Sequence, residues 1–313
     1  MLLRLDVMLD PDRLLSEANR VARDAYEFKR LLLSTREKLE FEARQRGDRA
    51  LVRLEPSEVR GLVLFGDVHG DIDTVVELMK VAKVGELLSS GYRLVFLGDY
   101  VDRGPRQVEA LALVALAKLW LGERAIVLRG NHEVSPWLPV YPHDYPEVLE
   151  MSFGERLAEE LYSASLSLFE TLPLALYVPT KLLAVHGGPP ITRVLERSSA
   201  EEILGDLYSD KLAIEEILWS DPIDEDIEWA YSFRGAGKLW GERVTREALR
   251  KLGIELIVRG HEPCISGYKL NHGGRVLTLF SMKGYYGNIE AACSVIPLDA
   301  VGKVDPSSFV VRV

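Results

Sequence analysis

The chain has 313 residues, a formal net charge of −10 and two cysteines. Its length allows a large buried core, in one large domain or in two smaller ones. The acidic balance argues against a general nucleic-acid-binding surface. Cys264 and Cys293 are too few for a disulfide framework and lack the Cys-x-x-Cys spacing of a structural zinc site, so we expect both to pack as small apolar side chains.

The N-terminal region carries early charges, including Arg4 and Asp6, and has no long apolar run. We therefore expect neither a signal peptide nor a membrane span, and a cytoplasmic location follows as the default. Residues 11 to about 55 carry apolar side chains at helical spacing, with charges on the other face. This pattern predicts a helical segment over residues 1–55 packed on a main domain over residues 56–313. A partner-binding arm is the alternative.

From Gly61 onward, short apolar runs alternate with helical stretches, which predicts an α/β core. The later strands come with tight glycine turns and little helix, so we expect mixed sheets. The helices are expected at residues 72–84, 105–121 and 155–171. The later strands are expected at residues 181–186, 254–259, 275–280, 290–297 and 308–313.

Asparagine and glutamine are scarce, with four and two copies in the whole chain. These thermolabile residues are depleted in proteins that work at high temperature, which indicates a thermophilic source. An asparagine retained under that pressure is more often there for a reason. This draws attention to Asn131, Asn271 and Asn288.

Three clusters of acid, His and amide residues each follow a short apolar run. Their reference residues, Asp67, Asp99 and Asn131, follow one another at intervals of 32 residues. The strand ends of one sheet can lie side by side, so ligands remote in sequence can meet there. The clusters are Gly-Asp-Val-His-Gly at 66–70, Gly-Asp-Tyr-Val-Asp-Arg-Gly at 98–104 and Gly-Asn-His-Glu at 130–133.

Histidines also follow two later apolar runs, at His186 and His261. Four of the six histidines therefore come directly after predicted strands. The other two, His143 and His272, sit among Pro or Gly in loops, and we expect them at the surface.

Taken singly, a His after a strand is more often a hydrogen-bonded structural residue, but the set points to a metal site. Oxygen and nitrogen donors without thiolate suit Mn, Fe or Zn. Six donors are too many for one catalytic ion with an open position, but they suit two ions that share a carboxylate. Such a pair can drive phosphoryl displacement and can lower the pKa of bound water to about 7. The donors are Asp67, His69, Asp99, Asn131, His186 and His261.

Two neighbouring side chains complete this chemistry. Arg103 offers a planar guanidinium that can bind phosphate in a bidentate manner, although a surface ion pair is the usual role of an Arg. His132 could protonate a leaving oxygen, and a carboxylate on its other nitrogen would orient the ring and raise its pKa. Asp102 is the candidate carboxylate.

These residues together resemble the phosphoprotein phosphatases, the metal-dependent Ser/Thr protein phosphatases of the calcineurin-like metallophosphoesterase superfamily. The likeness runs from about residue 40 to the end, and six motifs in order make it specific. Besides the three clusters, the motifs are His-Gly-Gly at 186–188, Leu-Trp-Ser-Asp-Pro at 218–222 and Arg-Gly-His-Glu at 259–262.

The resemblance implies an α/β metallophosphoesterase fold, with two mixed β-sheets packed as a sandwich, flanked by helices and preceded by the N-terminal helical segment. It implies one-step hydrolysis of phosphoserine or phosphothreonine in proteins by metal-bound water, with no nucleic-acid or membrane partner. Two divalent cations are implied, Mn first and Fe or Zn as alternatives. Residues 56–313 would then be the catalytic domain.

The resemblance also implies roles by position. Asp67 and His69 would hold the first metal, Asp99 would bridge, and Asn131, His186 and His261 would complete the second. His132, paired with Asp102, would be the general acid. The substrate phosphate would lie against Arg103, Asn131, Arg234 and Tyr285.

The chain departs from the family pattern at four places, and each affects substrate or inhibitor specificity more than the metal set. They are Asp71 in place of Gln, the Pro-rich stretch 134–146, Ser232-Phe233 before Arg234, and the stretch 282–287 around Tyr285. Three alternatives remain open from the sequence: a dinucleoside polyphosphate hydrolase, a metallonuclease, and a non-catalytic scaffold with a phosphatase-like fold.

Overall fold

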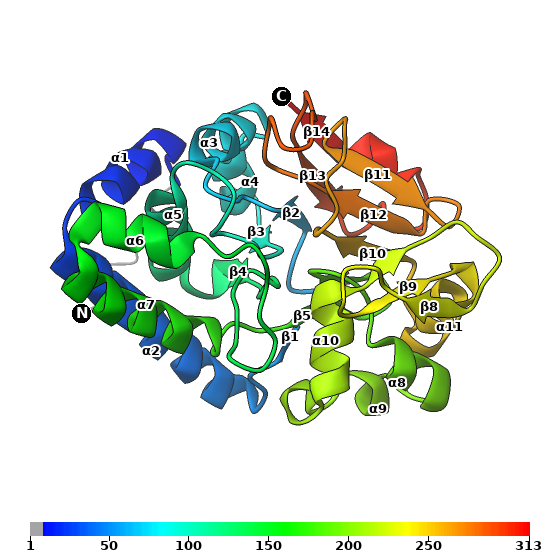
Figure 1. Ribbon diagram of the computed structural model, residues 1–313. Helices are drawn as coiled ribbons and strands as arrows, with labels where there is room; N and C mark the ends of the chain where they lie inside the picture. Colours follow the sequence, from blue (N-terminus) through cyan, green and yellow to red (C-terminus); the bar gives the residue numbers. More distant parts are fainter. Residues whose placement is uncertain (1–8) are drawn as a thin grey trace.

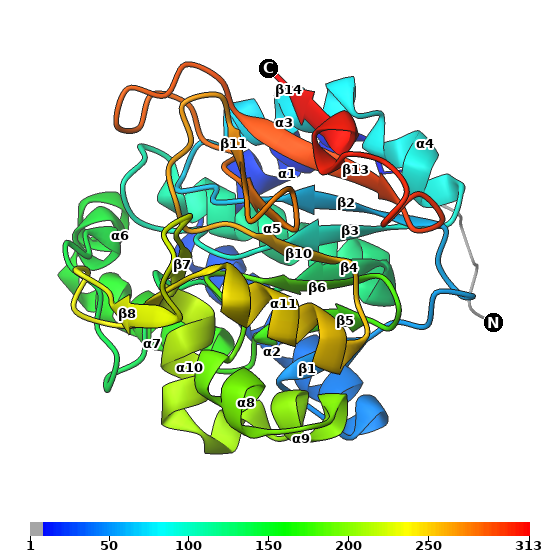
Figure 2. The same cartoon turned by 90° about the vertical axis from the view of Figure 1, so that its right-hand side faces the viewer.

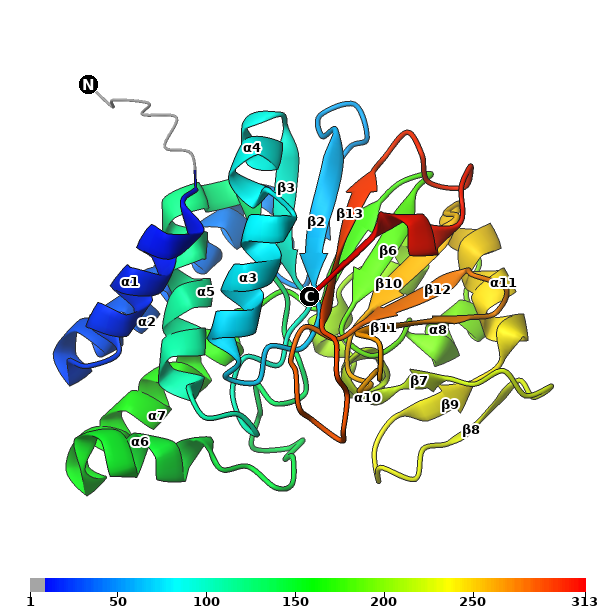
Figure 3. The same ribbon diagram turned by 90° about the horizontal axis from the view of Figure 1, so that it is seen from above.

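The computed structural model describes residues 9–313 and contains two β-sheets packed face to face with helices on both outer sides (Figures 1 and 3). The first sheet has the order β14-β13-β2-β3-β4, in which β2, β3 and β4 run parallel and β13 is antiparallel to both of its neighbours. Its strands are β2 (Gly61–Phe65), β3 (Tyr92–Phe96), β4 (Ala125–Val127), β13 (Ala292–Pro297) and β14 (Val310–Arg312).

The second sheet has the order β1-β5-β6-β10-β12-β11 and is also mixed, since β6, β10 and β12 run parallel while β5 and β11 pair antiparallel. Its strands are β1 (Leu51–Arg53), β5 (Ala175–Val178), β6 (Leu182–Val185), β10 (Leu256–Arg259), β11 (Tyr268–Asn271) and β12 (Val276–Leu279). A small third sheet contains β7 (Asp221–Pro222), β8 (Trp229–Tyr231) and β9 (Lys238–Trp240). The mixed sandwich confirms the expected fold class.

Strand β2 shows why these strands read as continuous apolar runs. Its side chains alternate between the two faces, as strand geometry requires. Val63 and Phe65 belong to the cluster under the helices, whereas Leu62 and Leu64 belong to the cluster between the two sheets. All five residues of β2 are buried because both faces of the strand are covered.

Helices cover the outer face of each sheet, and Figure 3 shows the resulting layers from above. The helices over the first sheet are α1 (Pro11–Val21), α2 (Ala25–Arg46), α3 (Ile72–Val81), α4 (Val84–Ser89), α5 (Gln107–Leu121), α6 (Tyr145–Phe153) and α7 (Glu155–Phe169). Those over the second are α8 (Ile191–Glu196), α9 (Ala200–Leu204), α10 (Lys211–Trp219) and α11 (Glu242–Leu252). Short 3₁₀ turns cover Gly122–Arg124, Leu207–Ser209 and Pro306–Phe309. Within residues 9–313, no helix combines the length and apolar character needed to cross a bilayer.

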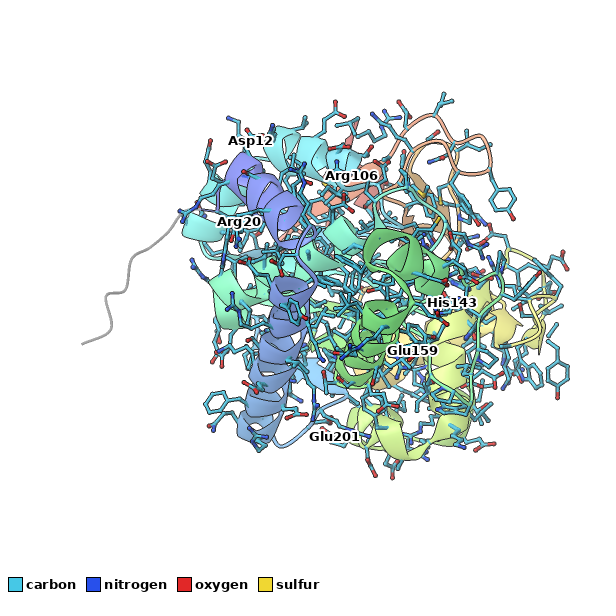
Figure 4. All side chains as sticks on the ribbon, turned by 60° about the vertical axis from the view of Figure 1, so that its left-hand side comes forward. Asp12, Arg20, Arg106, His143, Glu159 and Glu201 are labelled. Carbon is cyan, nitrogen blue, oxygen red and sulfur yellow. The ribbon has the colours of Figure 1, made fainter. Side chains whose placement is uncertain are left out.

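Helices α1 and α2 lie against α5 and α7 and bury their apolar stripe there. Asp10 accepts hydrogen bonds from Asp12 N and Arg13 N at the start of α1, as an N-cap does. Charged side chains add further contacts. Arg106, which Figure 4 labels, binds Asp73 at the start of α3 and Asn19 of α1. The buried Lys118 of α5 donates to Glu42 of α2 at 2.5 Å. Residues 1–8, part of the predicted N-terminal segment, lie outside the described residues.

Most expected elements are present, with shifted ends, but the helical segment predicted to residue 55 ends at Arg46, and Leu51–Arg53 form strand β1, which pairs with β5 in the second sheet. The predicted helix at 72–84 ends at Val81, and a separate helix, α4, which was not predicted, begins at Val84 after Lys83 in a left-handed conformation. Helices α6 and α8–α11 were not predicted. Cys264 and Cys293 are buried and unpaired with each other, as expected. The prediction of a surface His272 is wrong: this ring is buried, with Nδ1 at 2.8 Å from Thr245 Oγ1 and Nε2 at 2.9 Å from the Ile223 carbonyl.

The two sheets meet at the carboxyl end of β2. Asp67 forms a parallel bridge with Phe280, which follows β12 of the other sheet. The approach is so close that a Cβ atom on Gly66 would stand 2.0 Å from the Leu279 carbonyl oxygen. Glycine is therefore required at this position, and loops from both sheets converge beside it.

Candidate metal centre and active site

The six predicted metal donors all lie at this junction. Asp67 and His69 follow β2, Asp99 follows β3 and Asn131 follows β4 in the first sheet, while His186 follows β6 and His261 follows β10 in the second. All six side chains are buried. Figure 2 shows the loop between β12 and β13, the helix α6 and the strand β8 on one side of the molecule, and loops from this side surround the junction.

Short distances join the donors through Asp99 and Asn131. Asp99 Oδ2 lies 3.4 Å from His69 Nε2 and 3.3 Å from His186 Nε2. Asn131 Oδ1 lies 3.0 Å from both His186 Nε2 and His261 Nδ1. Two groups of three side chains come close enough to hold an ion, and they share Asp99: His69, Asp99 and His132, and Asp99, His186 and His261.

The first of these groups contains His132 where Asp67 was predicted. Asp67 nevertheless lies in the same cluster, with Oδ2 at 3.9 Å from His69 Nε2. Its Oδ1 accepts a hydrogen bond from the backbone N–H of His261 at 2.7 Å. His132 is turned toward Asp102 instead, as described below.

The histidine rings are oriented by backbone carbonyls. His69 Nδ1 lies 2.8 Å from the Val101 carbonyl, and His186 Nδ1 lies 3.0 Å from the Leu97 carbonyl. A carbonyl oxygen only accepts, so Nδ1 carries the proton in both rings, and Nε2 points into the cluster. Metal-binding histidines typically have this arrangement, in which the second nitrogen donates to a carbonyl or carboxylate.

The cluster concentrates negative charge in a buried place. Burial, followed by the charge of Asp99, raises the pKa of Asp67 to about 6 and that of Glu133 to about 7. Burial lowers the pKa of His69 to about 4 and that of His261 well below its usual value, so these rings are neutral near pH 7. Buried carboxylates require a positive partner.

Two further features of the donor residues fit divalent cations. The buried Nε2 of His261 has no hydrogen-bond partner among residues 9–313, and imidazole nitrogens face carboxylate and amide oxygens across the cluster. The donors are all oxygen or nitrogen, which suits Mn, Fe or Zn.

The backbone at the site is strained, and a buried carboxylate supports it. His69, Asp99 and His261 have φ values of 43°, 57° and 70°, in the left-handed region that non-glycine residues rarely adopt. The Glu133 carboxylate accepts hydrogen bonds from the backbone N–H groups of Asp99, Tyr100 and Gly130 at 2.7, 2.8 and 2.9 Å. Glu133 therefore fixes the loops that present Asp99 and Asn131.

His132 and Asp102 are in contact, as the sequence predicted. His132 Nδ1 lies 2.5 Å from Asp102 Oδ2. Burial alone would lower the pKa of His132, but the carboxylates of Asp99 and Asp102 outweigh burial and raise it. Burial likewise opposes ionisation of Asp102, but hydrogen bonds from His132 and His143 hold the pKa of Asp102 well below its usual range.

Arg103 and Arg234 line the same cavity, whose volume is about 540 Å³, together with Asp67, Asp99, His132 and Tyr285. Arg234 Nε donates to Asp221 Oδ2 at 2.7 Å, and the other oxygen of Asp221 accepts from the buried Arg259 at 2.8 Å. Within residues 9–313, no carboxylate lies within ion-pair distance of the Arg103 guanidinium.

Tyr285 lies beside His69, with ring centroids 6.0 Å apart, and stacks on Phe280. Burial raises its pKa to about 12, so the hydroxyl keeps its proton near pH 7. Asn288 closes this loop: its Oδ1 accepts from Tyr285 N, and its Nδ2 donates to the Met282 and Glu290 carbonyls.

The prediction that His143 lies at the surface is wrong. Its side chain is 15% exposed, and its Nδ1 lies 2.8 Å from Asp102 Oδ2. The error arose because His143 follows a proline, a position typical of exposed loops, whereas the loop from Val134 to Asp144 folds back over the site. Sequence reasoning also assigned no role to Glu133, Asp144 or Asp221. Glu133 and Asp221 stand inside two of the sequence motifs, and that position was the signal that could have identified them.

Comparisons with known proteins identify the family of the chain. A family model described as calcineurin-like phosphoesterase matches residues 62–264. A protein of Encephalitozoon cuniculi named a probable serine/threonine-protein phosphatase is 33% identical over 247 residues, which is 78% of this chain and 51% of that protein. The serine/threonine-protein phosphatase 4 catalytic subunit of Kluyveromyces lactis is 32% identical over 239 residues, covering 75% of this chain and 74% of the subunit. The chain thus spans about half the length of the first relative.

Among solved structures, a protein serine/threonine phosphatase from Saccharomyces cerevisiae with similarity to human phosphatase PP5 has a TM-score of 0.73 at 21% identity, covering 93% of this chain and 89% of that one. A cold-active protein-tyrosine phosphatase of a psychrophilic Shewanella has a TM-score of 0.55 at 16% identity, covering 79% and 78%. At these identities the likeness concerns the fold. Because the family model covers most of the sequence, the chain belongs to the calcineurin-like phosphoesterase family.

Proposed function

We propose that the protein is a phosphomonoesterase that uses two divalent cations to hydrolyse phosphoserine and phosphothreonine in proteins. The observation that carries the proposal is one cavity that is lined by five of the six donors, all but His186, together with His132, Arg103 and Arg234. The names of the E. cuniculi and K. lactis relatives support the substrate class.

In this proposal, Asp67 and His69 would hold one cation, Asn131, His186 and His261 would hold the other, and Asp99 would serve both. When bound, the cations supply positive charge that neutralises the phosphate and lowers the pKa of water to about 7. Mn is the preferred ion, with Fe or Zn as alternatives that the donor set also suits.

The chain's own residues then position the phosphate and move one proton. Arg103 and Arg234 bind the phosphate oxygens, and Asp221 orients Arg234 through the 2.7 Å hydrogen bond. Asn131 and Tyr285 complete the phosphate pocket. Asp102 orients His132, whose Nε2 faces away from the carboxylate and donates its proton to the leaving oxygen as the phosphorus–oxygen bond breaks.

The proposed partners are phosphoproteins or phosphopeptides. The proposed catalytic domain covers residues 56–313, and the helical segment precedes it. The acidic balance of the chain argues against nucleic acid as a substrate.

The test is hydrolysis by protein loaded with Mn. We expect turnover of phosphoserine and phosphothreonine peptides, loss of turnover with a chelator, and recovery with Mn. Asp67→Asn should abolish turnover, while Glu40→Gln on the outer helix α2 is a matched carboxylate control that should not. Failure to hydrolyse any phosphopeptide or aryl phosphate would overturn the proposal, and faster turnover of diadenosine tetraphosphate would favour the polyphosphate hydrolase.

A further inference from the structure

A second imidazole binds the carboxylate that orients His132. Asp102 Oδ2 lies 2.5 Å from His132 Nδ1 and 2.8 Å from His143 Nδ1, and Asp102 Oδ1 accepts from Tyr145 N at 2.9 Å. Asp102 is fully buried. The orientation of this carboxylate is therefore fixed by three donors, one of which is His143.

The hydroxyl of Tyr162, on helix α7, fixes the other end of the His143 ring. The Tyr162 oxygen lies 3.0 Å from His143 Nε2. A carboxylate accepts, so His143 Nδ1 carries a proton and donates to Asp102, which leaves Nε2 free to accept from the Tyr162 hydroxyl. Both ring nitrogens thus have a partner, and the position of the ring is set from both sides.

Asp144, which follows His143 in the loop, supports Arg103, which follows Asp102 in the site. Asp144 Oδ1 accepts from the backbone N–H of Arg103 at 3.1 Å, and Asp144 Oδ2 accepts from Gln107 Nε2 at 3.0 Å. Gln107 Oε1 in turn accepts from Asp102 N at 2.9 Å. Two consecutive loop residues, His143 and Asp144, therefore contact two consecutive site residues, Asp102 and Arg103.

These contacts lie where the backbone needs support. Asp102 and Arg103 have φ values of 65° and 71°, and residues in this region persist only when the surroundings hold them. The loop that provides the support is the Pro-rich stretch in which the sequence departs from the phosphoprotein phosphatase pattern. The same loop also forms one wall of the cavity, through Pro139, Val140, Tyr141 and Pro142.

We propose that His143 is a positioning residue for proton transfer: it fixes the Asp102 carboxylate, and through it the ring of His132, in the orientation that protonates the leaving oxygen. This inference rests on the proposed function, because it needs His132 to act as the general acid. It assigns to the Pro-rich loop a part in catalysis besides forming the cavity wall.

A leaving-group comparison tests the proposal. Nitrophenolate leaves without a proton, whereas the serine alkoxide needs one. Poor positioning of the acid should therefore slow hydrolysis of a phosphoserine peptide more than hydrolysis of p-nitrophenyl phosphate. For His143→Phe, we expect kcat on a phosphoserine peptide to fall about 10- to 100-fold, while kcat on p-nitrophenyl phosphate changes less than about 3-fold. KM and Mn content should stay unchanged. His143→Asn places an amide donor near the position of Nδ1 and should recover most of the loss.

One control and one fallback variant accompany this pair. His272→Asn alters a buried histidine outside the cavity and should leave the ratio of the two kcat values unchanged. If His143→Phe does not fold, His143→Ala is measured with and without added imidazole, which should restore turnover of the phosphoserine peptide. Equal losses on both substrates, no loss on either, loss of bound Mn, or no rescue by either route would overturn the proposal.

The outcomes separate this inference from the proposed function. Wild-type protein that hydrolyses no phosphate ester would end both. Active wild-type protein whose His132→Ala variant loses the phosphoserine peptide selectively, while His143→Phe does not, would end the inference alone. A His132→Ala variant that shows no dependence on the leaving group would remove the general-acid role and the inference with it.

Discussion

Ser281 and Asp67 are bound to each other across the junction of the two sheets. Ser281 N donates to the Asp67 carbonyl at 3.1 Å. Ser281 Oγ accepts from Gly66 N at 2.9 Å and donates to the Ala292 carbonyl at 2.7 Å. The hydroxyl of this buried side chain therefore connects the loop that carries a predicted metal ligand to the loop after β12.

Ser281→Ala should lower both stability and metal affinity. The change leaves a buried N–H and a buried carbonyl without partners, at about 1–3 kcal/mol for each unsatisfied group. We expect a loss in the free energy of unfolding of that order in urea titrations, together with weaker Mn binding by calorimetry. Ser152→Ala, which removes an exposed hydroxyl from α6, is the control. Unchanged stability and Mn affinity would show that the junction does not depend on this hydroxyl.

Asp99 and His132 should separate metal binding from proton transfer. Asp99→Ala removes the carboxylate shared by both donor groups, so we expect loss of metal as well as turnover. His132→Ala should keep the metal and lower kcat on a phosphopeptide about 10²–10⁴-fold, the range for a general acid. Metal analysis of both purified variants checks this. Metal lost from His132→Ala and kept by Asp99→Ala would contradict the assignments.

Asp221 should matter for phosphate binding although it lies behind Arg234. Neighbouring positive groups, among them the guanidinium groups of Arg259 and Arg234, overcome burial and lower the pKa of Asp221 to about 2, so it is ionised at working pH. Asp221→Asn removes this charge and loosens the guanidinium of Arg234. We expect KM for a phosphopeptide to rise about 10-fold, equivalent to ~1.4 kcal/mol of binding. Arg243 forms an exposed ion pair with Glu228, and Arg243→Lys is a control that should leave KM unchanged.

Metal-free protein should lose stability as the pH rises from about 6.5 to 8. The native pKa values of Asp67 and Glu133 are raised to about 6 and about 7, and those of His132 and His186 are also raised. In each case the native state binds more protons than the unfolded chain, so stability falls as pH rises through the native pKa values.

His69 and His261 act in the opposite direction, but they do so below their unfolded pKa of about 6.5. Urea unfolding with a chelator at several pH values measures the effect, and saturating Mn should reduce it because the cation replaces the protons. Greater stability of the chelated protein at pH 8 than at pH 6.5 would contradict this account.

The buried Lys118–Glu42 pair should hold the N-terminal helices against α5. Lys118 Nζ also donates to the Gly122 and Ala125 carbonyls at 3.0 and 2.9 Å. Lys118→Met leaves the buried Glu42 carboxylate with only its longer ion pairs to Lys38 and Arg46, at 3.5 and 3.7 Å, which should lower the free energy of unfolding by up to about 3–5 kcal/mol. The double variant Glu42→Leu with Lys118→Met should recover most of that loss in the same urea titration. A single variant as stable as wild type would contradict the role of the pair.

The positions of the six donors could be predicted because a simple rule of sheet topology applies to them. Each stands directly after an apolar run, and the parallel strands β2, β3 and β4, with β6 and β10, bring those ends together. The contact of His143 with Asp102 could not be predicted in this way. It depends on the path of a loop without periodicity, over a separation of 41 residues.

Other misses have physical causes of the same kind. The helix predicted at 72–84 ends early, at Val81. Its end depends on one backbone conformation, at Lys83, which a helical apolar pattern does not specify. His272 sits in a glycine turn, as predicted, but the turn folds under β9 and α11 so that the ring is covered. Asn288, by contrast, was singled out by the scarcity of amides, and it closes the Tyr285 loop with three hydrogen bonds.

The donors at the sheet junction come from positions as far apart as Asp67 and His261, which are 194 residues distant in the chain. No fragment that lacks either sheet contains the whole set. An ion that binds there would recognise only a chain whose two halves have already assembled, and its binding energy would be added to that assembled form alone. Cation loading would thus serve the protein as a check on complete folding.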